Sequence, residues 1–362
     1  MRPLAELLAE DTFAKADVVR LLGLADPAEI EALRQAAFDR TTATLGDKVH
    51  YRGIVEFSNR CALDCRYCGI RKSNRSVPRY TLDVGQVVDA ALWCAAAGYG
   101  SCVLQSGERR DERFIAFVED CVTEIRRRSV SKTLPQGLGI TLSCGEQDFD
   151  AYRRWRKAGA HRYLLRIETT NPALFARIHP PEQRLETRVA ALGDLDRAGY
   201  QVGTGVMIGL PGQTLDDLAD DIGFFAARDI DMIGMGPYIV SAGGAMADEG
   251  MMATAPLMSL ALKMIAVTRL VLRDVNIAAT TALQALVPDG REKGISFGAN
   301  VTMPNLTPKD VRPNYQLYDG KPCIDEGRLE CRSCLEGRVL SAGRRVGWNE
   351  WGDSPHYGRR TG

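Results

Sequence analysis

Cys61-Ala62-Leu63-Asp64-Cys65-Arg66-Tyr67-Cys68 places three thiols within eight residues, directly after the run Gly53-Ile54-Val55-Glu56-Phe57. The apolar, β-branched run predicts a strand, so the thiols lie on a loop that leaves a strand. A zinc site or an ordinary iron–sulfur cluster takes four protein ligands. Because the fourth ligand is missing locally, the pattern indicates a metal centre with one position open to a ligand that is not protein.

Two other interpretations of these cysteines are weaker. A zinc knuckle normally has paired C-x2-4-C hooks, and only one such set stands here. A disulfide framework requires export, whereas Met1-Arg2-Pro3-Leu4-Ala5-Glu6 leads straight into charged, helical sequence. The ten cysteines are therefore expected in a reducing, cytoplasmic compartment, as metal ligands or buried thiols.

The composition is that of a globular protein and gives no reason to expect nucleic acid or a membrane as partner. Of 362 residues, 45% are hydrophobic and 25% charged, and Lys+Arg and Asp+Glu balance at 46 each. The longest apolar helix candidate, residues 256–272, contains Lys263 and Arg269. It is too short and too charged to span a bilayer.

From residue 50 the chain alternates strand-like and helix-like segments, which predicts a complete (β/α)8 TIM-type barrel. A doubly wound open sheet has the same local pattern, so closure rests on the count of units. The expected strands are residues 54–58, 101–105, 138–143, 163–167, 202–208, 232–236, 277–281 and 299–303. The seventh helix, around 282–295, has the poorest pattern.

Three regions follow from this pattern. Residues 1–48 predict an N-terminal helical extension, and residues 49–305 form the barrel. Residues 306–362 predict an irregular C-terminal extension, because prolines interrupt its first part, and its closing segment 344–362 is expected to lie along the surface.

Polar residues gather where the predicted strands end, which is where a barrel of this type carries its chemistry. Arg166 lies on a strand, and an unpaired Arg inside a barrel is costly, so it is expected to meet Glu168 or a substrate carboxylate. Glu168 either accepts the ribose hydroxyls of an adenosine or is a surface residue paired with Arg166 or Arg188. The substrate-side candidates are Ser143, Arg166, Thr281 and Tyr315.

The C-x3-C-x2-C spacing, with an aromatic before the last Cys, resembles the radical SAM signature. The resemblance implies a 4Fe–4S cluster on Cys61, Cys65 and Cys68, with the fourth iron binding S-adenosylmethionine (SAM), which is cleaved to a 5′-deoxyadenosyl radical. No catalytic side chain is expected beyond these cofactors. The implied SAM contacts are Ser106 in a small-Gly-Glu turn, Glu168, Arg188, and Tyr67 with Gly209, Leu210 and Pro211 beside the adenine.

Longer stretches resemble the HydE family of FeFe-hydrogenase maturases over most of residues 50–334, among them Gly209-Leu210-Pro211-Gly212-Gln213-Thr214 and Tyr315-Gln316-Leu317-Tyr318. This implies as substrate an organometallic iron–cysteine species carrying CO and cyanide, used in assembly of the hydrogenase H-cluster. It also implies an external electron donor and other hydrogenase maturases as partners. The segment 237–244 departs from the family by lacking a His-Pro-rich loop.

A second set, Cys323, Cys331 and Cys334, matches the position of an extra cluster in some members of that family. It would hold an auxiliary 2Fe–2S or 4Fe–4S cluster or zinc, or stay idle. The alternatives for the whole chain are a radical SAM relative of the methylornithine synthase or biotin synthase type, and a non-catalytic iron–sulfur scaffold or carrier.

Overall fold

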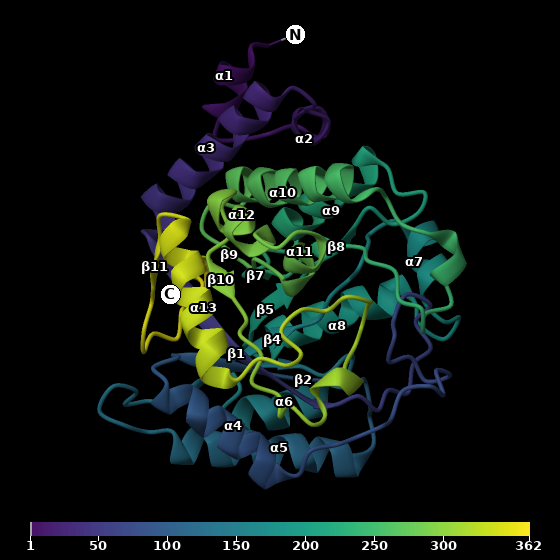
Figure 1. Cartoon of the computed structure of the whole chain (residues 1–362), viewed down its shortest axis with the longest axis vertical. Helices are drawn as coiled ribbons and strands as arrows, with labels where there is room; N and C mark the ends of the chain where they lie inside the picture. The colour runs from purple at the N-terminus through teal and green to yellow at the C-terminus, as the bar shows by residue number, and fades with distance from the viewer. Residues whose placement is uncertain (1) are drawn as a thin grey trace.

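A computed structural model describes residues 2–362, and its centre is a parallel barrel (Figure 1). Eight strands pair in the order β10-β1-β2-β3-β4-β5-β7-β9. Their bounds are β1 Lys48–Ser58, β2 Ser101–Ser106, β3 Gly139–Ser143, β4 Arg162–Leu164, β5 Gln201–Thr204, β7 Met232–Ile233, β9 Asn276–Ile277 and β10 Val301–Thr302. The ring is closed where the Ala279 N–H donates to the Val301 carbonyl at 2.9 Å and the Asn300 N–H to the Ile277 carbonyl at 2.9 Å. The complete barrel predicted from the sequence is therefore confirmed.

All eight expected segments contain a strand, but two of them are interrupted. The segments expected at 202–208 and 232–236 each continue after a break, as β6 Met207–Ile208 and β8 Gly236–Pro237, which pair with each other. Beside this break, regular pairing of β4 has already ended at Leu164, and Glu168, with φ of 66°, makes an isolated bridge to Val206.

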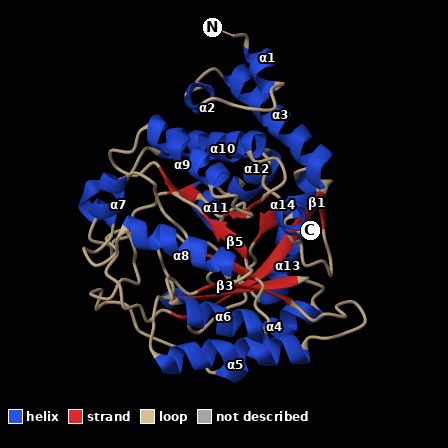
Figure 2. Ribbon diagram, turned by 180° about the vertical axis from the view of Figure 1, so that it is seen from behind, coloured by secondary structure: helices blue, strands red, loops and turns tan. Residues whose placement is uncertain are grey.

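Helices surround the barrel (Figures 1 and 2). They are α4 Val84–Ala96, α5 Glu112–Arg128, α6 Phe149–Ala158, α7 Pro172–Ile178, α8 Leu185–Arg197, α9 Leu215–Ala227, α10 Thr254–Val271, α11 Thr281–Leu286 and α12 Gly290–Ser296. Asp83, Asp111 and Asp148 cap α4, α5 and α6 by accepting backbone N–H groups of the first turn. The expected seventh helix is split into α11 and α12 near Pro288, in keeping with its poor pattern.

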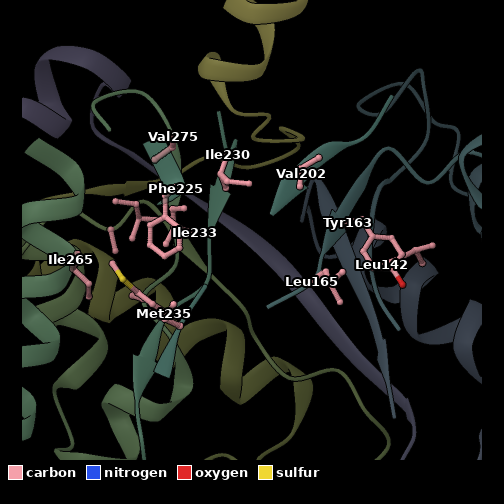
Figure 3. Close-up of a cluster of buried hydrophobic side chains, with 14 of the residues drawn as sticks. Leu142, Tyr163, Leu165, Val202, Phe225, Ile230, Ile233, Met235, Ile265 and Val275 are labelled. Carbon is pink, nitrogen blue, oxygen red and sulfur yellow. The ribbon is translucent and has the colours of Figure 1, made fainter. Parts of the chain in front are cut away.

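The hydrophobic core fills the layer between the strands and the helices. Figure 3 shows part of it, with Leu142, Tyr163 and Val202 from the strands and Phe225 and Ile265 from the helices. These five side chains are at most 3% exposed. At about 25 cal/mol per Å² of apolar surface, burial on this scale supplies the main force that holds the helices on the barrel.

The N-terminal extension is helical, as expected, with α1 Leu4–Leu8, α2 Lys15–Leu22 and α3 Pro27–Leu45. Helices α2 and α3 pack on α10, as Figure 1 shows. Contrary to the expectation for residues 256–272, α10 is long and apolar enough to cross a membrane, but 72% of it is buried inside the protein. Its Lys263 ammonium donates to the Leu24 carbonyl at 2.6 Å, and its Arg269 guanidinium donates to the Gly298 carbonyl at 3.0 Å.

The C-terminal extension is more ordered than the sequence indicated. It contains η2 Arg312–Asn314, α13 Arg328–Ser341, β11 Arg345–Val346, which pairs with the start of β1, and α14 Pro355–Thr361. The closing segment covers the end of the barrel where the strands begin, and does not simply follow the surface. There the fully buried Arg162 forms an ion pair with Asp353 and donates to the Trp351 carbonyl at 3.1 Å. The chain can pass this close because residue 352 is glycine, with φ of 65°, and a Cβ there would lie 2.4 Å from the His50 ring.

The Asp353→Ala substitution is expected to lower the free energy of unfolding by about 2 kcal/mol, because it leaves the buried Arg162 guanidinium without its counter-charge. The loss is smaller than for a fully buried pair, because Asp353 is 40% exposed and Arg162 keeps hydrogen bonds to Thr141 and Ser101. Chemical denaturation measures it. The exposed pair Asp47–Arg345, at 2.7 Å, provides the control, since Asp47→Ala should change stability by less than about 0.5 kcal/mol. Equal effects of the two substitutions would contradict a stabilising role of the Asp353 pair.

Candidate active site

A cavity of about 310 Å³ opens at the end of the barrel where the strands finish. Most of the residues predicted to bind cofactor or substrate line it together, although they come from segments spread over 250 residues of chain. They are Cys61, Cys65, Tyr67, Cys68, Ser106, Ser143, Arg166, Glu168, Arg188, Thr281 and Tyr315. The structure therefore brings the three thiols, the SAM-side candidates and the substrate-side candidates into one chamber.

The cysteine loop is anchored by backbone hydrogen bonds. The Ala62 N–H donates to the Glu108 carbonyl at 2.8 Å, and the Arg66 N–H to the Ile178 carbonyl at 2.9 Å. Close packing against the end of β2 requires glycine at position 107, where a Cβ would lie 2.5 Å from the Arg60 carbonyl oxygen. This explains the glycine of the Ser-Gly-Glu turn, whose Ser106 hydroxyl donates to the Gly107 carbonyl at 2.9 Å.

The thiols have the chemistry of cluster ligands. Burial raises the pKa of Cys61 and Cys65, and raises that of Cys68 to about 12, so they need a bound cation to ionise at neutral pH. Within residues 2–362, no group of three or more His, Cys, Asp or Glu side chains converges on a single metal ion. Ligands of a 4Fe–4S cluster bind different iron atoms, so they need not converge on one point. The donor set fits such a cluster better than one zinc ion.

Arg188, in the first turn of α8, is buried and forms an ion pair with Glu146, which follows β3. Its guanidinium also donates to the Arg166 carbonyl. The Arg110 guanidinium lies 3.2 Å from the Glu146 carboxylate and 2.7 Å from the Glu108 carboxylate, and so links the two. Glu146 was not among the predicted site residues, although its place just after a strand was a signal that could have identified it.

Glu168 is buried at the cavity wall, so the surface alternative is excluded. Its carboxylate lies 2.9 Å from the Arg166 guanidinium, which also donates to the Val206 carbonyl at 2.9 Å. Burial raises the pKa of Glu168, and the charges of Arg166 and Arg188 oppose this rise. Of the two expected partners of Arg166, Glu168 is therefore confirmed, and both residues line the cavity.

The loop after Glu168 is held by a second buried carboxylate, Asp221 of α9. Its Oδ1 accepts the Thr170 N–H at 2.7 Å and the Thr170 hydroxyl at 2.6 Å, while its buried Oδ2 has no hydrogen-bond partner. Burial raises the pKa of Asp221 to about 7, with the Thr170 hydrogen bonds opposing the shift.

Gly209, Leu210 and Pro211 are not among the residues that line this cavity. Leu210 packs in one cluster with Met207 and Tyr238, which do line it, and with Tyr67, so the expected place beside the adenine stays a prediction. The three residues 209–211 border a separate hollow near Met252, because Gly209, with φ of 82°, turns the chain away after β6. The following Gln213 closes this turn, accepting the Gly209 N–H at 2.7 Å and donating to the Met207 carbonyl at 3.0 Å. From this strand Met207 reaches the main cavity.

The C-terminal extension supplies one wall of the cavity, where Tyr315 was predicted from the sequence and Lys321 was not. Lys321 is buried and pairs with Glu56 of β1, and its ammonium donates to the Tyr315 carbonyl at 2.9 Å. The Gly69 N–H donates to the Leu317 carbonyl at 2.9 Å, which joins this segment to the cysteine loop. Residues 315–321, here called the strap, thus cover the substrate side. Nearby, the Thr281 hydroxyl accepts a hydrogen bond from Arg291 at 3.0 Å.

The second cysteine set lies beyond the strap. Cys323 follows it directly, and Cys334 is exposed on α13, where its sulfur accepts a hydrogen bond from the Arg338 guanidinium at 3.3 Å. The side chain of Cys331 lies outside the described residues. An auxiliary cluster at Cys323, Cys331 and Cys334 therefore stays a prediction.

Comparison with known proteins agrees with this site. A family model described as the radical SAM superfamily matches residues 55–225, which include the cysteine loop, Ser106 and Arg188, and so defines a radical SAM protein. The FeFe hydrogenase maturase subunit HydE of Thermotoga maritima is 40% identical over 352 residues, 97% of each chain. The chain therefore belongs to the HydE family of FeFe-hydrogenase maturases, which are radical SAM enzymes.

Solved structures share the fold. Methylornithine synthase superposes with a TM-score of 0.78 at 23% identity, covering 96% of this chain and 97% of the other. The FeFe-hydrogenase maturase HydG from Carboxydothermus hydrogenoformans gives 0.78 at 17% identity, covering 94% and 78%. At these identities the similarity shows the barrel architecture alone.

The Asp221→Asn substitution is expected to flatten the pH dependence of stability. The folded-state pKa of about 7 lies above the unfolded value of about 3.9. The contribution of protonated Asp221 to the free energy of unfolding is therefore complete below about pH 4 and is lost as the pH rises through 7. An amide keeps the Oδ1 acceptor without ionising, so the variant should be more stable than the parent at pH 8. Urea unfolding at pH 5 and pH 8 measures this, with a parental slope of up to about 1.4 kcal/mol per pH unit. The same slope in both proteins would show that Asp221 does not titrate as stated.

Proposed function

We propose that Cys61, Cys65 and Cys68 hold a 4Fe–4S cluster, that SAM binds beside it in the main cavity, and that the substrate is an iron–cysteine species carrying CO and cyanide on its way to the hydrogenase H-cluster. One observation carries the proposal: a single cavity is lined by the three thiols, by groups suited to a nucleoside, and by groups suited to an anionic substrate. When bound, the cluster and SAM together supply a 5′-deoxyadenosyl radical.

The chain's own residues would orient SAM. Ser106 and the backbone around Gly107 offer polar groups at the end of β2 for the methionyl amine. Arg188, held by Glu146, places a positive charge for the methionyl carboxylate. Glu168 presents a carboxylate to the ribose hydroxyls, and Tyr67 contributes a ring on the cysteine side. Because these groups are already fixed by neighbours, little order would be lost on binding.

Arg166 is the main substrate-side group in this proposal. Its guanidinium lies at the cavity wall, and its Nε is buried without a hydrogen-bond partner, so it retains a donor for the carboxylate of a cysteine-bound species. Ser143, Thr281 and Tyr315 border the same space. The strap above them excludes water, which a reactive radical requires.

The proposed function also requires partner proteins. The family and the substrate class suggest another maturase as the source of the iron–cysteine species, and an external protein as the electron donor. An auxiliary cluster at Cys323, Cys331 and Cys334 would lie next to the strap, outside the main cavity.

The Cys65→Ala substitution is expected to abolish formation of 5′-deoxyadenosine, because two thiols cannot hold the site-differentiated cluster. The assay is anaerobic reconstitution with iron and sulfide, followed by dithionite and SAM. Cys121→Ala is the matched control, since Cys121 is a buried thiol of α5 outside the cavity, and it should keep parental activity. Parental 5′-deoxyadenosine formation by the Cys65 variant would overturn the site assignment.

The Arg166→Lys substitution tests the substrate side. Lys keeps the charge but cannot make the two-pronged contact with a carboxylate, so acceleration of SAM cleavage by the iron–cysteine complex should fall at least tenfold. Cleavage of SAM without that complex should change less than threefold. An equal loss in both assays would assign Arg166 to SAM, and an unchanged response would remove it from the substrate site.

A further inference from the structure

Gln183 lies against one of the three cluster cysteines, in the loop between α7 and α8. The Cys65 sulfur is 3.3 Å from the Gln183 Oε1, and the side chain lines the main cavity. Gln183 is only 6% exposed, and its buried Nε2 has no hydrogen-bond partner. A buried amide with an unused donor beside a metal ligand calls for an explanation, because such donors are normally satisfied.

The contact seen here suits a protonated thiol, which donates its S–H to the amide oxygen. A cluster-bound cysteine is a thiolate and has no hydrogen to donate, so the same oxygen would then face a negative sulfur. The two ends of an amide have nearly the same shape, and rotation of the terminal torsion exchanges them without moving the backbone. That rotation would bring the unused Nε2 donor to the sulfur.

We propose that in the cluster-loaded protein the Gln183 amide donates an N–H···S hydrogen bond to the Cys65 thiolate and thereby raises the reduction potential of the cluster. The inference rests on the proposed cluster at Cys61, Cys65 and Cys68. Reduction adds negative charge to the cluster sulfurs, so a donor stabilises the reduced form more than the oxidised form. Gln183 is a positioning residue in this account, since it acts through Cys65.

The loop is built to keep Gln183 in place. The Gln183 N–H donates to the Pro180 carbonyl at 2.9 Å, and the two consecutive prolines 180 and 181 restrict the turn. The Arg66 guanidinium donates to the Arg177 carbonyl at 3.1 Å. Together with the Arg66 N–H bond to Ile178, this ties the loop to the cysteine loop, so the amide and the thiol keep their relative position.

The test is a potentiometric titration of the reconstituted cluster by EPR, in the absence of SAM. Gln183→Met keeps the side-chain length but removes the donor. At a fixed ambient potential its ratio of reduced to oxidised cluster should fall about tenfold, equal to about 59 mV for a one-electron couple. Gln147→Met is the matched control, because Gln147 is also 6% exposed but donates to the Arg109 and Cys144 carbonyls, away from the cluster cysteines. It should keep the parental ratio.

Gln183→Glu provides a second variant of the same size, whose carboxylate at pH 8 cannot donate, and its ratio should fall at least as far. If the Gln183→Met protein does not retain iron, the ratio of reduced to oxidised cluster in the Gln183→Glu protein is the measurement that tests the inference. A parental potential in an iron-replete Gln183 variant would overturn the inference, as would a change confined to SAM affinity. If the parental protein does not assemble a cluster, the proposed function is contradicted instead. Failure of the inference on Gln183 and failure of the proposed function are therefore distinguishable.

Discussion

The backbone anchoring of the cysteine loop is the constraint on which the rest of the site depends. Three N–H groups of the loop, at positions 62, 66 and 69, donate to carbonyls of Glu108, Ile178 and Leu317. These acceptors belong to the end of β2, the end of α7 and the strap. The thiols are therefore positioned by three distant parts of the chain, and these parts have to come together before the three sulfurs are in place.

The cavity also collects ion pairs, and two of them join two structural elements. Arg188–Glu146 joins α8 to the end of β3, and Lys321–Glu56 joins the strap to β1. The third pair, Arg166–Glu168, lies within the segment after β4, with its charged groups 2.9 Å apart. Buried pairs add little net stability, because desolvation offsets their attraction. Their value here is geometric: a charged ligand meets side chains that are already oriented and already desolvated, and so less reorganisation accompanies binding.

The local pattern was enough to predict much of this structure. Alternating segments identified all eight strands, and the cysteine spacing identified the loop, because both are short-range signals. The ion pair of Lys321 with Glu56 could not be predicted, since 265 residues separate the partners and nothing in either segment indicates the other.

Two features had a local signal that was given too little weight in the prediction. In α13, Leu335 and Val339 are buried one helical turn apart, a spacing that predicts a helix within the supposedly irregular extension. In the Gly209–Gln213 turn, Gln213 follows a glycine that takes a positive φ, and its side chain satisfies the loop's own backbone. Turn chemistry therefore accounts for the glycine and the glutamine of that motif.

The two ends of the barrel differ: the closing segment covers one end, and the main cavity lies at the other. This difference limits the routes by which a ligand can reach the site. At the strand-start end, the closing segment packs Gly352 against the His50 ring, and Arg52 donates to the Gly352 carbonyl at 2.9 Å. Below the main cavity the interior narrows to a chamber of about 30 Å³, which has room for little more than water. A ligand the size of SAM would therefore have to enter from the end where the strands finish. The cysteine loop and the strap both line the cavity there, and the Gly69 N–H bond to the Leu317 carbonyl joins them, so their positions are coupled.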